Sequence, residues 1–475
     1  MKKVLATVAA LGLVLGVTAN ALALDQPGRA TQVERTDQPR VPEPTAPGVA
    51  LWSVAGQWVL AGAYLQDGLG LPGGADVYDE SDGNDAFYIY SFKILPVLQI
   101  NDKISMKGEI RFDDRTVFGD GTSGGSGASL RDADFKHVYM EWVSPWGKTR
   151  FGRTPAGAWA GNFMNSSGQG DRLMWWPNML PENWGSLLFT QKIVEADAGG
   201  SDLSIPSIND QSDGDVDGYY VDLSYKASFG RTIAALWMVR NAVSEVADSA
   251  LTTTQFRLYG NYDFSPFNIE YELNYDFGDG RPEPGFTNAS DRSALGFHLD
   301  GSMKWEDFTF GGLFFYMSGD DDPTDNDSNA MFGAANGVGK DYNPYQIMTG
   351  DYMNMLNCDN PLSIAAGNGG CSPIFFADGG SSGVWSLGGY TKFALSPQIS
   401  FTGEIGYFAA PDQPSGWDSD MGWEFGLGMD YKIMDNLTYN AHFSYLTAGD
   451  FFKGGDSDAS TSNVYLLAHA LSMKF

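Results

Sequence analysis

Hydrophobic and polar residues alternate along most of the chain after residue 50. Between residues 267 and 277 the odd positions are Phe, Ile, Tyr, Leu, Tyr and Phe, whereas the even positions are Asn, Glu, Glu, Asn and Asp. Segments 103–113 and 421–433 alternate in the same way. Successive side chains of a β-strand point to opposite faces, so a period of two predicts strands with one apolar and one wet face.

About eighteen such segments follow one another from residue 51, and their connections alternate between short and long. Residues 101–102, 145–147 and 435–436 are short turns, whereas the stretches between the resulting hairpins are long. Single-chain outer-membrane barrels have short turns at one end and longer loops at the other, and a soluble sandwich has no reason to segregate its connections. We therefore predict an all-β fold: a transmembrane antiparallel up-and-down β-barrel of about 18 strands, with short periplasmic turns and long outer loops.

The last predicted strand, 464–475, ends the chain on Phe475. Its odd positions are apolar except for His469, and its even positions are mostly small or polar. A chain that stops on an aromatic residue at the end of such a strand resembles the closing strand of a bacterial outer-membrane barrel. The alternative for this stretch alone is the edge strand of a soluble sandwich.

The N-terminal residues have the composition of a secretory signal peptide. Basic residues at positions 2 and 3 precede an apolar core at 4–17, and Ala21, Leu22 and Ala23 supply a cleavage site. Residues 24–50 are rich in proline and poor in apolar clusters, which predicts a flexible periplasmic leader. The expected organisation is a signal peptide at 1–23, a leader at 24–50 and a barrel at 51–475.

Composition and charge argue against two classes of protein, namely nucleic-acid-binding proteins and helical membrane proteins. The formal net charge is −30, which argues against nucleic acid as a partner. After the signal peptide no apolar run approaches the roughly 20 residues of a membrane-spanning helix. Barrel strands need only about 9–11 alternating residues, so a transmembrane barrel remains compatible with the composition.

Together these features resemble a Gram-negative outer-membrane porin, and more weakly an alginate-export-like barrel. Besides the signal peptide, the strands and Phe475, the segment 146–153, Trp-Gly-Lys-Thr-Arg-Phe-Gly-Arg, is similar to the porin strand that precedes the constriction loop. The resemblance implies a location in the bacterial outer membrane, contact with its lipid and lipopolysaccharide, and passage of small hydrophilic solutes. It places a constriction loop at 154–170. Whether three barrels associate as a homotrimer is left open.

The wet faces of the strands identify candidate pore-lining residues of both signs. They are Lys103, Lys107, Glu109, Arg111, Arg150, Arg153, Asp222, Arg240, Arg257, Glu270, Glu272, Arg292, Asp300, Lys392, Glu404 and Glu424. Because cations and anions nearly cancel, the wall is mixed, which suits general diffusion better than polyanion export. For each residue the alternative to selective binding of a solute is that the side chain only keeps the lumen wall wet.

The predicted loops carry the excess negative charge. Asp213, Asp215 and Asp217 match the start of a Ca²⁺-binding EF-hand loop, but the twelfth position is Ser224 and not Glu. A weak Ca²⁺ site is therefore one interpretation, and a solvated acidic surface is the other. No other cofactor is expected.

The long connection at 318–382 contains both cysteines, Cys358 and Cys371. In an oxidising compartment a disulfide between them is the default. The same connection carries an aromatic and methionine-rich run that includes Tyr345 and Met348, which predicts that it folds inward or packs on the barrel mouth.

We interpret the chain as a channel for passive diffusion, narrowed by 154–170 and by the 318–382 connection. One alternative is a structural sheath or anchor for an extracellular or electron-transfer partner, and another is a polysaccharide-export barrel. An enzyme is not expected, because the sequence has no H-E-x-x-H and its four histidines are scattered over separate strands.

Overall fold

The computed structural model describes most of the chain after residue 50. The described residues are 51–66, 84–117, 133–155, 161, 163, 170–194, 216–241, 249–282, 291–320, 327–331, 344–349, 382–461 and 463–475. The predicted signal peptide and leader, Cys358 and Cys371 lie outside these residues. No helix in the described part is long and apolar enough to cross a membrane.

Twenty strands make up one sheet, and two of them have only two residues. The first half contains β1 (Leu51–Gln66), β2 (Asn84–Gln99), β3 (Ile104–Val117), β4 (Asp134–Ser144), β5 (Gly147–Thr154), β6 (Gly170–Pro177), β7 (Trp184–Gly185), β8 (Leu188–Val194), β9 (Val216–Ala227) and β10 (Gly230–Asn241). The second half contains β11 (Ser249–Asp263), β12 (Phe267–Pro282), β13 (Asp291–Trp305), β14 (Phe308–Met317), β15 (Asp327–Ser328), β16 (Val384–Ala394), β17 (Ile399–Ala409), β18 (Asp420–Met434), β19 (Leu437–Ala448) and β20 (Val464–Lys474). A short 3-10 helix, Asp450–Lys453, precedes β20.

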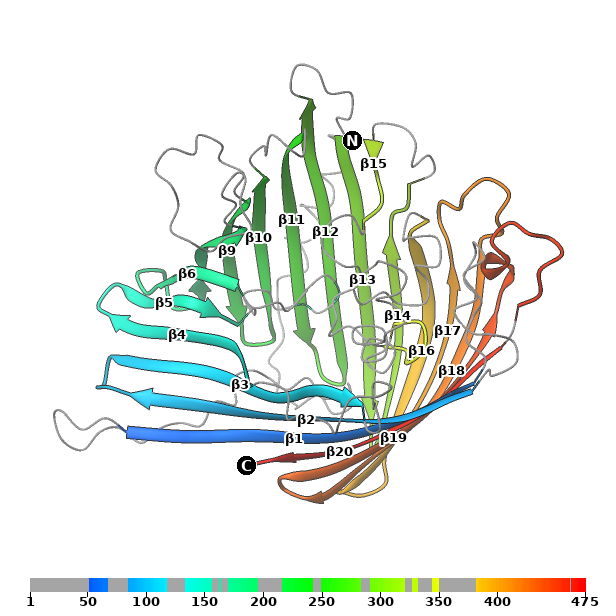
Figure 1. The fold of residues 1–475 in the computed structure, drawn as a ribbon, viewed down its shortest axis with the longest axis horizontal. Coiled ribbons are helices and arrows are strands. Elements are labelled where there is room, and N and C mark those ends of the chain that lie inside the picture. The colour runs from blue at the N-terminus through cyan, green and yellow to red at the C-terminus, as the bar shows by residue number, and fades with distance from the viewer. Residues whose placement is uncertain are drawn as a thin grey trace, which may run out of the picture.

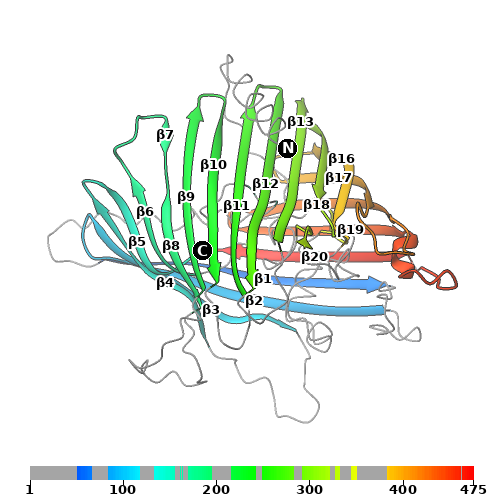
Figure 2. The same cartoon turned by 90° about the horizontal axis from the view of Figure 1, so that it is seen from above.

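The long strands form a closed ring (Figures 1 and 2). Each pairs antiparallel with its neighbours along the chain, and β1 pairs with both β2 and β20. The short strand β7 pairs with β9 beside β8, and β15 runs parallel to β13. Leaving out β7 and β15, eighteen strands complete the wall. The predicted fold class and strand number are confirmed.

The break between β7 and β8 has a local cause in the neighbouring strand. The Leu187 backbone N–H donates to the Asp222 carboxylate at 2.7 Å, and the Ser186 hydroxyl donates to the Asp222 carbonyl at 2.5 Å. Hydrogen bonds that involve side chains therefore replace two backbone hydrogen bonds of the regular β-ladder. Alternation of hydrophobic and polar residues alone does not reveal this substitution.

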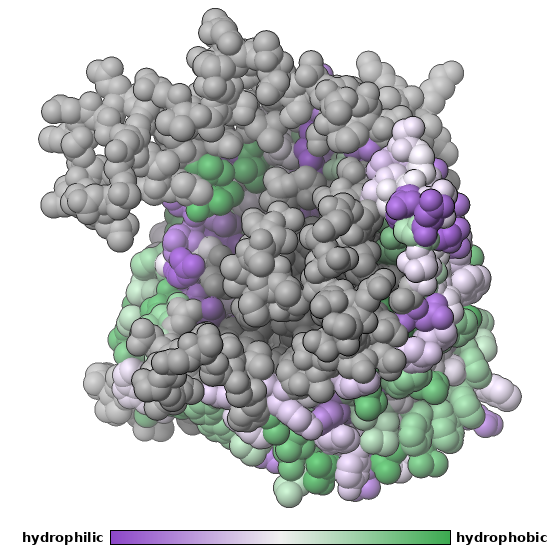
Figure 3. Space-filling view, turned by 45° about the vertical axis from the view of Figure 1, so that its right-hand side comes forward, coloured by the Kyte–Doolittle hydropathy of each residue, from purple (hydrophilic) through white to green (hydrophobic). Residues whose placement is uncertain are grey.

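The outer face of the wall is hydrophobic. Leu427 is 66% exposed and Leu387 is 59% exposed, although both lie in the middle of long strands. Hydrophobic side chains also form much of the lower wall in the space-filling view (Figure 3). A lipid-facing Arg or Lys at the bilayer midplane costs about 2–4 kcal/mol, so a face of this kind suits lipid and not water.

His469 interrupts this face in β20, and its neighbours explain how it is accommodated. Its ring centroid lies 5.6 Å from that of Tyr88 and 5.9 Å from that of Tyr439. Gly62, opposite it on β1, has no side chain, and a Cβ there would come within 2.7 Å of the imidazole. The histidine is thus set among aromatic rings in a space that a glycine leaves open.

The C-terminal residue completes the closure of the ring. Phe475 exchanges two backbone hydrogen bonds with Gly56, at 2.8 and 3.0 Å. Its ring stacks on Phe92 with centroids 6.2 Å apart and covers Gly56, where a Cβ would meet the ring at 2.2 Å. The terminal aromatic therefore covers the seam between the first and last strands.

We predict that Phe475→Asp reduces the yield of folded barrel, because a carboxylate replaces the stacked ring at this apolar seam. An aromatic pair contributes about 0.5–1.5 kcal/mol beyond its buried area. The measurement is the fraction of protein that migrates faster on a gel when unboiled. Phe475→Tyr, which keeps the ring, is the control and should fold like the parent. Equal folded fractions for Phe475→Asp and the parent would contradict the prediction.

Candidate functional site

The inner face of the wall is formed by the residues that alternate with the exposed hydrophobic ones. On β12, Phe267, Ile269 and Phe277 are exposed, whereas Glu272 and Asp276 are buried. Most of the residues predicted to line the pore lie on this inner face. They are Lys107, Glu109, Arg111, Arg150, Asp222, Arg257, Glu270, Glu272, Arg292, Asp300, Lys392, Glu404 and Glu424.

Three residues predicted to line the pore lie elsewhere. Lys103 belongs to the exposed turn before β3. Arg153 shares the outer face with Phe151, and Arg240 shares it with Met238, because each is two positions away along its strand. The prediction assigned both arginines to a wet inward face, whereas the phase of the alternation along β5 and β10 places them on the outer face.

Charges of opposite sign are segregated on the inner face. In the described middle of β2 to β6 the cations outnumber the anions: they are Lys93, Lys107, Arg111, Lys148, Arg150 and Arg172, with Glu109 and Glu141. In the middle of β12 to β18 the anions dominate: they are Glu270, Glu272, Asp276, Asp300, Glu404, Glu424 and Asp430, with Arg292 and Lys392. These two groups of strands are about half a turn of the ring apart. The charges cancel in the sum, as predicted, but they leave an electric field directed across the lumen.

Ion pairs and aromatic rings hold the cationic side in place. Glu141 bonds to the Lys107 ammonium at 2.9 Å and to the Arg150 guanidinium at 2.6 Å. The Arg150 guanidinium also lies 5.0 Å from the centre of the Trp176 ring, where Lys148 stacks at 4.3 Å. A carboxylate shared between cations and a ring beneath them restrict the rotamers of these long side chains, so their charges stay at fixed places on the wall.

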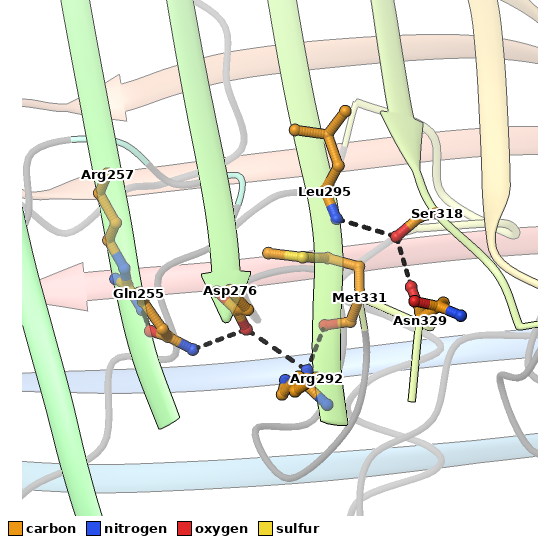
Figure 4. Close-up of polar contacts among 8 residues, drawn as sticks. All are labelled: Gln255, Arg257, Asp276, Arg292, Leu295, Ser318, Asn329 and Met331. Carbon is orange, nitrogen blue, oxygen red and sulfur yellow. Dashed lines mark hydrogen bonds and ion pairs between the residues drawn. The ribbon is translucent and has the colours of Figure 1, made fainter. Parts of the chain in front are cut away.

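On the anionic side a polar line crosses three strands (Figure 4). The Gln255 amide donates to Asp276 at 3.0 Å, and Arg292 donates to the same carboxylate at 3.3 Å. Arg292 also donates to the Met331 carbonyl at 3.4 Å. Met331 belongs to the connection that follows β14, so the wall arginine anchors a segment that has folded back against the barrel.

The strongest anchor of this kind is Glu424 on β18. Its carboxylate is fully buried and accepts the backbone N–H groups of Gln346, Ile347 and Met348, each at 2.8 Å. Three consecutive N–H groups around one carboxylate form an anion-binding nest. The sequence predicted that the 318–382 connection folds inward or packs on the barrel mouth, and its described residues 344–349 lie against the inner face of the wall.

A slot in the wall receives the Tyr345 ring. Gly388 on β16 and Gly406 on β17 are paired in register, and a Cβ on either would lie within 2.4 Å of the Tyr345 side chain. The ring meets Phe408 edge-on at 4.9 Å, and its hydroxyl donates to the Ile405 carbonyl at 3.4 Å. Burial raises the pKa of the Tyr345 hydroxyl, so it stays a protonated donor.

A second segment is anchored on the same side. The Phe163 backbone N–H donates to the Glu272 carboxylate at 3.2 Å. Its ring packs on Phe315 at 5.8 Å and stacks on His298 at 5.6 Å. Phe163 lies within the predicted constriction loop 154–170, of which only residues 154, 155, 161, 163 and 170 are described.

The anchoring role of Glu272 and Glu424 was not apparent from the sequence, which assigned both to a wet pore wall. Alternation reveals the face of a residue but not the chain segment that covers it. The one available signal was glycine: Gly422 and Gly426 flank Glu424, and Gly388 and Gly406 interrupt strands that are otherwise rich in large residues.

Of the residues considered for Ca²⁺, Asp213 and Asp215 lie outside the described residues, and Asp217 forms an ion pair with Lys192 at 3.4 Å.

Comparison with known proteins finds similarity at the level of solved structures. No protein-family model matches the chain, and no curated protein does. The chain is similar to OccK11 (OpdR) of Pseudomonas aeruginosa at 10% identity and a TM-score of 0.49, over 89% of this chain and 96% of that one. It is similar to the outer membrane protein OpdK of the same organism at 11% identity and 0.48, over 89% and 99%. OmpT of Vibrio cholerae with loop L8 deleted, also an outer membrane protein, is similar at 9% identity and 0.40, over 90% and 99%.

We predict that Glu424→Gln loosens segment 344–349, because a neutral amide offers the three N–H groups one oxygen and no charge. Charge-assisted hydrogen bonds contribute roughly 1.5–3 kcal/mol each and neutral ones about 1. Single-channel current in planar bilayers should become larger or noisier. Glu270→Gln, which removes an inner-face carboxylate that accepts from Asn261 and Tyr259 on the neighbouring strand β11, is the matched control. Identical current traces for the two variants would contradict the prediction.

Proposed function

We propose that this chain is a barrel of the bacterial outer membrane through which small hydrophilic solutes diffuse passively. The observation that carries the proposal is the arrangement of the wall: an exposed hydrophobic outer face surrounds an inner face that carries charges of both signs. An apolar band of about 25 Å outside and a polar interior are the properties of such channels. A soluble protein would place these two faces the other way round.

The inserted segments limit the size of the solute that can pass through the lumen. Residues 344–349, Met331 and Phe163 pack against β12 to β18, where they bury Phe315, Phe408 and Met421. The space left for a solute is bounded on the other side by the cationic wall of β2 to β6. A lumen narrowed in this way favours small solutes, and it supports neither a protein-filled sheath nor a conduit for a bulky polysaccharide.

Reconstitution tests the proposed function directly. Purified protein should open stable conducting events in planar bilayers, and proteoliposomes should swell in small sugars faster than in large ones. A barrel that is folded by the gel assay but electrically silent, and impermeable to small sugars, would overturn the proposal and favour the structural alternative.

A further prediction concerns ion preference. Because the chain carries a formal charge of −30, while the inner-wall charges nearly cancel, the mouth should attract cations more strongly than the lumen selects them. Exposed charges are screened over about 10 Å at 0.1 M salt and about 3 Å at 1 M. The reversal potential should therefore show cation preference in dilute KCl that fades towards 1 M.

Neutralising one acidic connection provides the control for this prediction. Changing Asp76, Asp79, Glu80 and Asp82 of the connection, together with Asp85 at the start of β2, to Asn or Gln should weaken the preference in dilute salt and leave conductance at 1 M nearly unchanged. Anion preference of the parent in dilute KCl would show instead that the cations of β2 to β6 dominate.

A further inference from the structure

Two carboxylates lie close together where the inserted segment 344–349 meets the wall. Glu404 on β17 is paired in register with Gly426 on β18, and Glu424 on β18 is paired with Gly406 on β17, so the carboxylates are diagonal neighbours on the inner face. Glu424 is fully buried, and the side chain of Glu404 is 8% exposed. Among the described residues, neither carboxylate forms an ion pair with Lys or Arg.

His442 on β19 completes this group. Its Nε2 atom lies 3.2 Å from the Glu404 carboxylate. A Cβ on Gly426 would come within 2.3 Å of that carboxylate, and a Cβ on Gly428, which is paired with His442, would come within 2.9 Å of the imidazole. Two glycines of β18 therefore leave the space in which the imidazole and the carboxylate meet.

The other titratable and charged groups around His442 have partners of their own. They are Asp430 on β18, Lys392 and Tyr390 on β16, Asp300 on β13 and Tyr345 of the inserted segment. Asp430 lies 3.8 Å from the Lys392 ammonium, and Asp300 accepts from the Tyr390 hydroxyl at 2.9 Å. The Tyr345 hydroxyl donates to a backbone carbonyl, and β20 presents Ala468 opposite His442. Within the described part of the barrel, Glu404 is thus the carboxylate whose positive partner would be His442.

Seating the inserted segment separates both carboxylates from the water of the lumen. Covering two like charges costs free energy unless a positive charge accompanies them. A protonated His442 would supply that charge to Glu404, whereas a neutral His442 would not. Proton binding and seating of the segment are therefore linked, and each favours the other.

We propose that His442 is a proton-controlled positioning residue, which acts through Glu404 to hold segment 344–349 in the lumen. The proposal deepens the proposed channel function and rests on it. Histidine is the side chain that ordinarily changes charge between about pH 5 and pH 8. Acidification in this range seats the segment and narrows the lumen, and a rise in pH loosens it.

Single-channel currents recorded at about pH 5.5 and about pH 8 test the linkage. The parent should carry the smaller and quieter current at the lower pH. His442→Gln, which is neutral throughout, should conduct at the lower pH as the parent does at the higher one. Glu404→Gln, which removes one of the two covered charges, should conduct at the higher pH as the parent does at the lower one. Loss of packing at the pair would not move the two variants in opposite directions.

The matched control is His137→Gln, in a second histidine–carboxylate pair of the inner face. His137 lies 3.7 Å from Glu109, but Glu109 already forms an ion pair with Arg111 at 2.6 Å. Its charge is therefore balanced without a proton on the histidine. His137→Gln should keep the pH response of the parent, and every variant should remain heat-modifiable on gels.

Amide hydrogen exchange follows the segment without any current. Residues 346–348 donate their N–H groups to Glu424 in the seated position, which protects them from exchange. At one fixed, neutral pH these groups should exchange roughly tenfold more slowly in Glu404→Gln than in His442→Gln. If His442→Gln does not fold, Glu404→Gln should still exchange more slowly than the parent at the higher pH.

The outcomes distinguish this proposal from the channel function. A parent whose current is the same at both pH values would overturn the role of His442 and leave the channel standing. A pH response that persists in His442→Gln would overturn it as well, because another group would then carry the response. A folded barrel that never conducts would overturn the proposed function, and equal exchange in the two variants would then overturn the positioning role separately.

Discussion

The fold depends on the requirement that every backbone N–H and C=O within a membrane finds a partner in the protein itself. The pairing of β1 with β20 meets this requirement, because it removes the two edges that an open sheet of this size would present. The C-terminal Phe475 continues the pairing to Gly56. Once the ring is closed, side chains have only two directions, outward to the membrane or inward to the lumen, and the alternating sequence assigns nearly every residue to one of them.

The interior follows a second rule, that a buried carboxylate needs donors at hydrogen-bond distance. Glu424 and Glu272 obtain theirs from the backbone of segments that enter the lumen, and Asp276 obtains them from Gln255 and Arg292. Asp222 obtains one from the backbone of Leu187 and interrupts the wall as a result. The polar inner face is thus not uniformly wet: part of it organises the chain that narrows the lumen.

Much of the barrel could be predicted from the sequence, because alternation and turn length are local properties. The eighteen-strand wall and the inward side chains of β12 follow from them. The aromatic and methionine-rich run of the 318–382 connection separately predicted that it folds inward or packs on the barrel mouth. Arg153 and Arg240 were assigned to the wet inner face, whereas they alternate with the inward residues of their strands and lie on the outer face. The partners of Glu424 lie 76 to 78 positions away in the chain, and no local pattern connects them.

The nest around Glu424 attaches residues 346–348 to the wall through their backbone and not through their side chains. Because the carboxylate binds main-chain N–H groups, its hold on residues 346–348 does not depend on which side chains they carry. The side chains of the segment are constrained separately, because Tyr345, Ile347 and Met348 are fully buried against the wall. Substitutions that keep the size and apolar character of these side chains should therefore leave the segment attached to the wall.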